Sequence, residues 1–238
     1  MRIAVVSDKG GRNINEDSVG RLKRDGIYCF VLADGLGGHG GGETASSVAV
    51  KTVLQCFDSQ AEVSEDILYA YLEAAQNAIH EKRQENTALS KMSTTIIVLV
   101  TDGKKAVWAH CGDSRLYRFK GNLIQEVTDD HSVAFVSFVA GDIEYDDIRR
   151  SPDQNRLLRT LGDKSKFEPD IAKVQKINKK TSFLMCSDGF WEYVDEDYME
   201  EARKQSSSPK EWLAGMLEER RKNAPVDCDN YSAIAVFI

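Results

Sequence analysis

Short apolar runs rich in β-branched residues recur along the chain and predict strands. Turn residues join some of these runs into hairpins, as Lys120, Gly121 and Asn122 do between two neighbouring runs. Because hairpins pair antiparallel strands, the sheets are expected to be mostly antiparallel. The predicted strands cover residues 3–7, 27–33, 94–100, 106–111, 115–119, 123–127, 182–186 and 232–238.

Apolar residues at helical spacing predict two helices, over residues 43–57 and 64–83. A further helix is expected to begin near Ser208, because this capping serine is followed by Pro209 at the first helical position and by Glu211 three residues after the cap. The helices fall between groups of strands rather than after every strand. This order favours an α+β fold, in which helices cover antiparallel sheets in layers.

No linker rich in proline, serine or glycine divides the 238 residues, and no segment repeats at a fixed period. A chain of this length can form one large core, so we expect a single domain over residues 1–238. Residues 131–161 have a mixed pattern and are interpreted as an insertion at the surface.

Composition and charge exclude several classes of protein. The net charge of −7 disfavours a general affinity for nucleic acid or anionic membranes. No apolar run approaches the roughly 20 residues of a spanning helix, and the first residues lack the apolar stretch of a secretory signal. The five cysteines are scattered and form no CxxC pair, which is typical of free thiols in a reducing compartment. We therefore expect a cytoplasmic protein without nucleic-acid or membrane partners.

Four aspartates stand at the ends of predicted strands. Asp34, Asp113 and Asp188 each follow a strand directly or after one small residue, and Asp229 shortly precedes the final strand. Carboxylates are rarely buried unless they are paired or bound to a cation, so these four are expected to converge at one rim of the sheets. An all-oxygen ligand set suits magnesium or manganese, whereas zinc would recruit histidine or cysteine, and no such cluster is evident in the sequence.

An aspartate followed by glycine is also a common turn, so each such pair needs its own interpretation. Asp25–Gly26 and Asp102–Gly103 lie between short strand-like segments and are assigned to hairpin turns. Asp34 differs, because it opens a ten-residue segment, 34–43, in which six residues are glycine. Such a loop lets the backbone approach a ligand closely. No Lys-Ser or Lys-Thr follows it, so it is not a nucleotide-binding P-loop.

A series of short motifs follows in order along nearly the whole chain. They are Ser7-Asp8-Lys9-Gly10, Arg12 with Asn15-Glu16-Asp17, Ala33-Asp34-Gly35-Leu36-Gly37-Gly38-His39, Ser93-Thr94-Thr95, Gly112-Asp113-Ser114-Arg115, residues 157–162, Cys186-Ser187-Asp188-Gly189 and Asp229-Asn230. Together, in this order and spacing, they resemble the type 2C (PPM) metal-dependent protein serine/threonine phosphatases in their bacterial form. The resemblance implies a four-layer α-β-β-α sandwich in which helix pairs flank two mostly antiparallel sheets, and it identifies the insertion at about 131–161 as the flap of that family.

The resemblance also implies a binuclear metal centre. Asp34 would bridge two cations, the carbonyl of Gly35 would be a further ligand, and Asp188 and Asp229 would complete the first site. Asp113 resembles the ligand of a third metal, shared with Asp188. The expected cofactors are therefore two or three Mn²⁺ or Mg²⁺ ions per chain.

Three further residues match acidic and basic positions of the family. Glu16 and Asp17 match residues that hold metal-bound waters, and Arg12 matches the arginine that binds the substrate phosphate. Ile14 departs from the more usual polar residue at its position but leaves the other three in register.

Hydrolysis is expected to use a metal-activated water without a phosphoenzyme, and the chain has no CxxxxxR loop of the cysteine-dependent phosphatases. The proton donor for the leaving oxygen stays open. Leu36 occupies the position of a histidine found in many eukaryotic relatives, so His39 is the nearest candidate acid and a metal-bound water is the alternative. His131, at the start of the flap, is expected to have a structural or substrate-facing role.

Three functions are compatible with these residues. The first, which retention of every candidate aspartate favours, is an active phosphatase of phosphorylated proteins that opposes a bacterial serine/threonine kinase. The second is a catalytically silent phosphopeptide-binding or scaffolding relative, which would be expected to have lost a ligand such as Asp188 or Asp229. The third is a phosphatase of a transcription or sporulation regulator. A monomer whose partners are the kinase or its substrates is expected.

Overall fold

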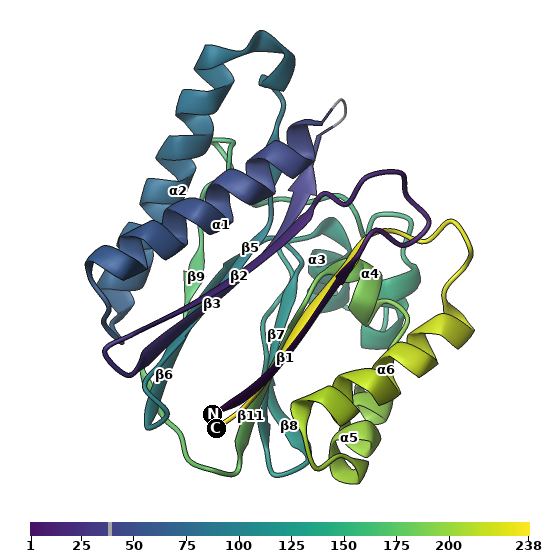
Figure 1. Ribbon diagram of the computed structural model, residues 1–238. Helices are drawn as coiled ribbons and strands as arrows, with labels where there is room; N and C mark the ends of the chain where they lie inside the picture. Colours follow the sequence, from purple (N-terminus) through teal and green to yellow (C-terminus); the bar gives the residue numbers. More distant parts are fainter. Residues whose placement is uncertain (38–39) are drawn as a thin grey trace.

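Two sheets pack face to face, and pairs of helices cover their outer faces (Figure 1). The computed structural model describes residues 1–37 and 40–238. All strand pairs in the two sheets are antiparallel. The expected four-layer α+β sandwich is therefore confirmed.

The five-stranded sheet has its strands in the order β1-β12-β11-β7-β8, and the seven-stranded sheet is built around the order β10-β6-β5-β3-β2. The strands of the first sheet are β1 (Arg2–Asp8), β12 (Tyr231–Phe237), β11 (Thr181–Cys186), β7 (Arg115–Lys120) and β8 (Leu123–Val127). Those of the second are β10 (Gln175–Lys176), β6 (Lys105–Cys111), β5 (Ile96–Thr101), β3 (Ile27–Leu36) and β2 (Asp17–Arg24), with β4 (Ser93–Thr94) beside β3 and β9 (Asp170–Ile171) beside β6.

Helices α1 (Gly41–Ser59) and α2 (Glu65–Glu85) cover the seven-stranded sheet, while α5 (Glu196–Gln205) and α6 (Pro209–Asn223) cover the five-stranded one (Figure 1). The Ser208 hydroxyl accepts the backbone N–H of Glu211, so α6 begins at its predicted cap. Shorter helical segments are η1 (Thr87–Leu89), α3 (Val133–Ala140), η2 (Tyr145–Arg150) and α4 (Asp188–Trp191).

Strand β3 shows how the alternation of side chains builds the layers. Phe30 and Leu32 point into the apolar layer between the two sheets, whereas Cys29, Val31 and Ala33 point into the layer beneath α1 and α2. Full burial of each large apolar side chain contributes about 1.5 to 3 kcal/mol. Asp34 follows these buried residues near the end of the same strand, where it pairs with Asp17 of β2.

Several elements differ from the sequence prediction. The strand expected over 94–100 is interrupted at Thr95, which lies between β4 and β5. Strand β2 was not predicted, because its residues DSVGRLKR include few large apolar side chains; it nevertheless pairs with β3 through the predicted turn at Asp25–Gly26. Residues 131–161, for which a mixed pattern predicted an insertion and no particular element, contain α3 and η2.

All five cysteines are free thiols. Four of them are buried, and Cys56 on α1 is half-buried. Burial raises the pKa of Cys111 to about 12 and also raises the pKa of Cys29 and Cys186. Within the residues described, none of the helices combines the length and apolar character that crossing a bilayer requires.

Candidate metal centre

The four strand-end aspartates meet in one pocket with a volume of about 590 Å³. Asp34 lies near the end of β3, and Asp113 follows β6. Both strands belong to the seven-stranded sheet. Asp188 is the first residue of α4, directly after β11, and Asp229 precedes β12 in the other sheet. The two sheets therefore contribute carboxylates to the same pocket, as the sequence predicts.

Asp17 ties the two sheets together at the base of this group. It lies opposite Asp34 in the β2–β3 register, and its side chain is buried. The hydroxyl of Ser187, beside Asp188, donates to Asp17 Oδ2 at 2.8 Å. Asp17 Oδ1 is buried and has no hydrogen-bond partner among the described residues. An unpartnered carboxylate oxygen at this depth is suited to a ligand that can donate to it.

The pKa values of several acids in the pocket are raised, because their carboxyls are buried close to one another. Burial raises the pKa of Asp34 well above its ordinary value, and the charges of Asp17 and Asp188 raise it further. Burial followed by the charge of Asp188 likewise raises the pKa of Asp113, and burial followed by Asp229 raises that of Asp188. Burial raises the pKa of Asp17 to about 7. These carboxylates repel one another unless positive charge is supplied between them.

Gly35 is required where it stands because the backbone of α1 approaches it closely. A Cβ atom at this position would lie 2.2 Å from the carbonyl oxygen of Gly42 and 2.6 Å from that of Glu16. The N–H of Gly35 donates to the same Glu16 carbonyl at 3.2 Å. This packing brings Glu16 to the pocket, where burial raises the pKa of its carboxyl.

Arg12 lies at the mouth of the pocket. Its Nη2 donates to Asp229 Oδ2 at 3.0 Å, and 57% of its side chain is exposed. The loop that carries it is held by Asn230, whose Nδ2 donates to the carbonyls of Lys9 at 2.8 Å and Ile14 at 2.9 Å. The Asn230 Oδ1 accepts the N–H of Glu16 at 2.8 Å. Asn230 thus fixes the positions of both candidate residues on this loop.

One sequence expectation cannot be placed here, because His39, the candidate acid, lies outside the described residues. Glu192, which the sequence analysis did not single out, lies one helical turn after Asp188 and lines a different pocket, with Arg149 and Tyr193. Burial followed by the charge of Asp188 raises the pKa of Glu192 to about 8. Its four-residue spacing from Asp188 is the signal for this proximity, but it counts only if a helix begins at Asp188, which was not predicted.

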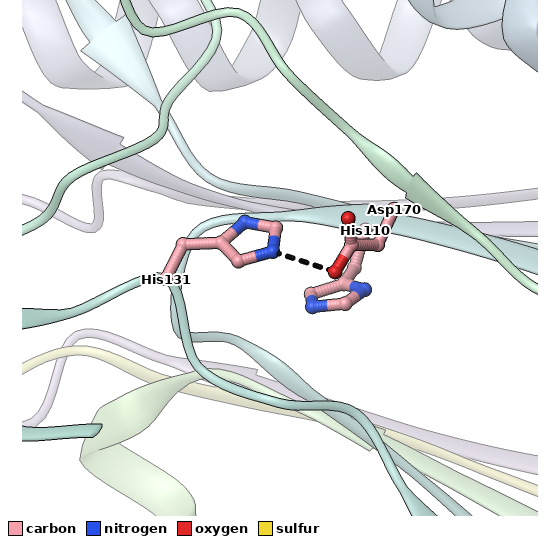
Figure 2. Close-up of side chains that lie close together, drawn as sticks. All are labelled: His110, His131 and Asp170. Atoms are coloured by element: carbon pink, nitrogen blue, oxygen red, sulfur yellow. Dashed lines mark hydrogen bonds and ion pairs between the residues drawn. The ribbon is translucent and has the colours of Figure 1, made fainter. Parts of the chain in front are cut away.

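His131 is buried and lies beside His110 and Asp170 (Figure 2). Its Nδ1 accepts the N–H of Gly112 at 3.2 Å, so its Nε2 carries the proton and donates to Asp170 Oδ2 at 3.1 Å. The ring of His110 stacks on it at 4.5 Å between centroids, and His110 Nε2 donates to the carbonyl of Asp129 at 2.8 Å. A structural role for His131 agrees with these contacts.

The fold thus gathers His110, His131 and Asp170 so that one ligand atom of each lies within 4.8 Å of the others. This corrects the expectation that no histidine cluster exists, since residues 60 positions apart meet only after folding. Both Nε2 atoms donate their protons to oxygen, and Nδ1 of His131 accepts the N–H of Gly112, so these hydrogen bonds hold the Gly112 loop in place.

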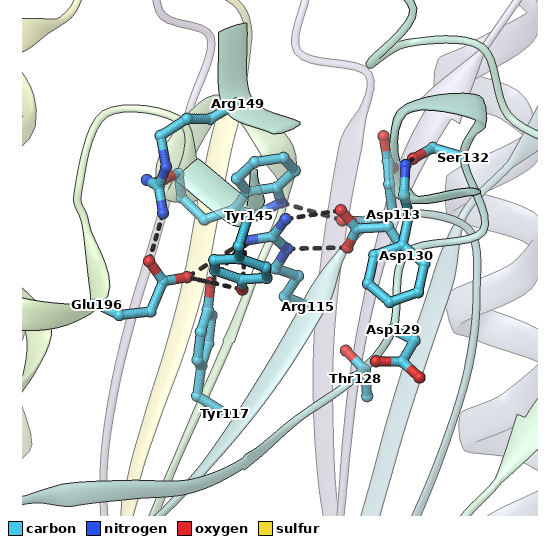
Figure 3. Close-up of polar contacts among 12 residues, drawn as sticks. Asp113, Arg115, Tyr117, Thr128, Asp129, Asp130, Ser132, Tyr145, Arg149 and Glu196 are labelled. Atoms are coloured by element: carbon cyan, nitrogen blue, oxygen red, sulfur yellow. Dashed lines mark hydrogen bonds and ion pairs between the residues drawn. The ribbon is translucent and has the colours of Figure 1, made fainter. Parts of the chain in front are cut away.

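A second polar group, the Arg115 cluster, lies on the other side of Asp113 (Figure 3). It consists of Arg115, Tyr117, Asp130, Tyr145, Arg149, Trp191 and Glu196. Arg115 Nη2 and Asp130 Oδ2 are 2.7 Å apart, with both side chains 2% exposed. Trp191 stacks on the Arg115 guanidinium and donates through Nε1 to the carbonyl of Asp113 at 3.0 Å. Glu196 of α5 joins the cluster to Arg149 and Tyr145 of η2.

A profile for the family described as Protein phosphatase 2C matches residues 10–224. A serine/threonine phosphatase stp from Listeria welshimeri is 31% identical over 218 residues, which cover 89% of this chain and 86% of that protein. The crystal structure of the Mycobacterium tuberculosis serine/threonine phosphatase PstP/Ppp matches with a TM-score of 0.88 and 26% identity, covering 100% of this chain and 98% of that one. A structure of the PstP catalytic domain in complex with two manganese ions matches with a TM-score of 0.83 and 26% identity, covering 98% and 96%.

Proposed function

The chain belongs to the protein phosphatase 2C family and is a metal-dependent protein serine/threonine phosphatase; from this premise, we propose that the pocket at Asp34 is its catalytic centre. The observation that carries the proposal is the convergence of four strand-end aspartates from two sheets in one pocket. We further propose that two or three Mn²⁺ or Mg²⁺ ions bind there.

The chemistry of the pocket fits hard divalent cations. Its acidic groups offer only oxygen, and burial and mutual repulsion raise the pKa of Asp34, Asp113 and Asp188. Such a group is stabilised by positive charge placed among its members. The unpartnered Oδ1 of Asp17 is a further acceptor for water around such ions.

In this proposal each residue has a distinct role. Asp34 would be shared by two cations, with the Gly35 carbonyl, Asp188 and Asp229 completing their ligands. Asp113 would hold a third cation together with Asp188. Glu16 and Asp17 would act through bound water.

When bound, the cations would neutralise charge on the phosphoryl oxygens and acidify the water that attacks phosphorus. The chain itself orients the substrate. Arg12, at the mouth, presents a planar guanidinium that can donate to two phosphate oxygens at once. His39 is retained as the proposed acid for the leaving oxygen.

We propose phosphorylated proteins as substrates, among them a bacterial serine/threonine kinase or its targets. Five free cysteines support a reducing compartment, and hence the cytoplasm. Residues 1–238 are proposed to form one domain, with the flap at about 131–161 influencing which substrates bind.

The proposal is tested by phosphate release from a phosphothreonine peptide, with Mn²⁺ and after EDTA treatment. Release is expected to depend on Mn²⁺ and to fall by at least about 100-fold in Asp34→Asn and Asp188→Asn, since each removes a charged ligand near the reacting group. Asp25→Asn is the matched control, because Asp25 also precedes a glycine but lies in an exposed hairpin turn with φ 51°. Equal loss in all three variants, or full activity of Asp34→Asn, would contradict the assignment.

A further inference from the structure

A second pocket adjoins the proposed metal centre. Its volume is about 480 Å³, and Leu36, Asn155 and Leu157 line both pockets. Because they share three lining residues, the two pockets lie side by side. A ligand bound at the metal centre can therefore extend into the second pocket.

The second pocket has the opposite charge to the first. Arg83, Lys91 and Lys166 line it, against the single acid Asp163, although the whole chain has a net charge of −7. A basic recess beside an acidic one is not expected from overall composition. It provides a local site for an anion.

The single acid attracts Arg83 and Lys166 but leaves an excess of positive charge in this pocket. Asp163 Oδ1 accepts from the N–H and hydroxyl of Ser165, at 3.0 and 2.7 Å. Arg83 Nε donates to the carbonyl of Met92 at 2.9 Å, and Lys166 Nζ donates to that of Leu157 at 3.1 Å. These carbonyls hold the two side chains in place but carry no charge.

Lys91 is the accessible member of the group, because its side chain is exposed. It lies on the segment that leads into β4, so its distance from the metal centre follows from strand geometry. The N–H of Thr95 donates to the carbonyl of Asp34 at 2.8 Å, and Ser93 lies opposite Leu36. Lys91 is four positions before Thr95, so at about 3.3 Å per residue their Cα atoms are at most about 13 Å apart. An extended peptide covers that distance in three or four residues.

We propose that the pocket lined by Arg83, Lys91 and Lys166, here named the basic subsite, binds an anionic side chain of the substrate. That side chain belongs to a residue three or four positions from the one being dephosphorylated. The inference rests on the proposed function and narrows it to phosphoproteins whose phosphorylated residue has a carboxylate or a second phosphate nearby.

The test compares kcat/KM among phosphothreonine peptides that differ at one position. A neutral parent peptide is matched with peptides that carry glutamate, or a non-hydrolysable phosphonate analogue of phosphothreonine, one to five residues to either side. We expect one placement, three or four residues away, to raise kcat/KM by about 5- to 10-fold over the parent, through charge-assisted hydrogen bonds. A larger gain for the phosphonate identifies a second phosphate as the preferred group, and an equal or larger gain for glutamate identifies a carboxylate.

Lys91→Glu is expected to bring the ratio of kcat/KM for the preferred and parent peptides down to about 1. Lys210→Glu, which changes an exposed lysine on α6, is the charge-matched control and is expected to keep the ratio of the unmodified protein. The ratio should also fall as KCl is raised from 50 to 500 mM, about a threefold shortening of the screening length.

Equal kcat/KM for every placement, or an unchanged preference in Lys91→Glu, would overturn the basic subsite while leaving the phosphatase proposal intact. Absence of metal-dependent phosphate release from the parent peptide as well would overturn both. The two failures are therefore distinguishable.

Discussion

His131 holds the Gly112 loop only as a neutral ring, and this makes stability depend on pH. Burial, followed by the neighbouring His110, lowers the pKa of His131 to about 4 from an ordinary 6.5. Between these values the unfolded chain binds a proton that the folded protein does not, so this contribution to stability is complete above pH 6.5 and is lost as the pH falls to 4. The loss amounts to as much as about 3 kcal/mol.

We therefore expect the stability advantage of the unmodified protein over His131→Asn to shrink between pH 7.5 and pH 4.5. Urea unfolding in the presence of EDTA at both pH values measures it, with circular dichroism at pH 7.5 to check that the variant folds. An advantage that stays constant with pH would mean that His131 titrates in the folded protein as it does in the unfolded chain.

At the level of single residues, the sequence predicts those acids whose position at a strand end is itself a signal. Asp34, Asp113, Asp188 and Asp229 could be grouped because short apolar runs adjoin them. Glu192 has only its four-residue spacing from Asp188 as a signal, and this brings the two together only because α4 forms directly at Asp188. The positioning role of Asn230 was equally hidden, since it depends on the carbonyls of a loop more than 200 residues away.

Among the elements, strand β7 carries a buried and an exposed ion pair that are expected to contribute very differently to stability. Arg115 and Asp130 are both 2% exposed, whereas Arg118 and Glu126 are 20% and 36% exposed. Arg115→Met would leave Asp130 buried and uncompensated, and is expected to cost about 3 to 5 kcal/mol of unfolding free energy. Arg118→Met, three residues along the same strand, is the matched control and should cost no more than about 1 kcal/mol. Denaturant unfolding measures the loss of unfolding free energy in each variant. Similar losses in the two variants would mean that the Arg115 cluster does not hold η2 and α5 against the sheet.

The elements that sequence could predict are those with one apolar face or run. Helices α1 and α2 lie within a few residues of their predicted bounds, and α6 begins at its predicted cap. Strand β2 could not be recognised because it is a half-exposed edge strand, which needs few apolar residues. The two-residue strands β9 and β10 have no sequence signal of their own, since they form only where β6 offers a partner.

For the whole molecule, the proposed cations would join the two sheets, because Asp34 belongs to one and Asp188 follows a strand of the other. MnCl₂ is therefore expected to raise Tm of the unmodified protein, since a ligand that binds only the folded state stabilises it. Asp34→Asn should unfold at a higher temperature than the unmodified protein in EDTA, by about 2 to 6 °C, because it removes one buried charge from a repelling group.

The same variant should gain less in Tm from MnCl₂ than the unmodified protein. Thermal unfolding followed by circular dichroism measures all four conditions, and Asp25→Asn should behave as the unmodified protein in each. A Tm increase of equal size in Asp34→Asn would mean that the cation binds elsewhere.

The buried thiols have a consequence for redox biology. Peroxide oxidises the thiolate form of cysteine, and burial raises the pKa of Cys29, Cys111 and Cys186 so that these side chains stay protonated at neutral pH. The proposed catalytic pocket contains no sulfur nucleophile among its described lining residues. An oxidative burst that inactivates cysteine-dependent phosphatases would therefore leave this enzyme active. Its substrates would continue to be dephosphorylated, while the substrates of cysteine-dependent phosphatases would stay phosphorylated.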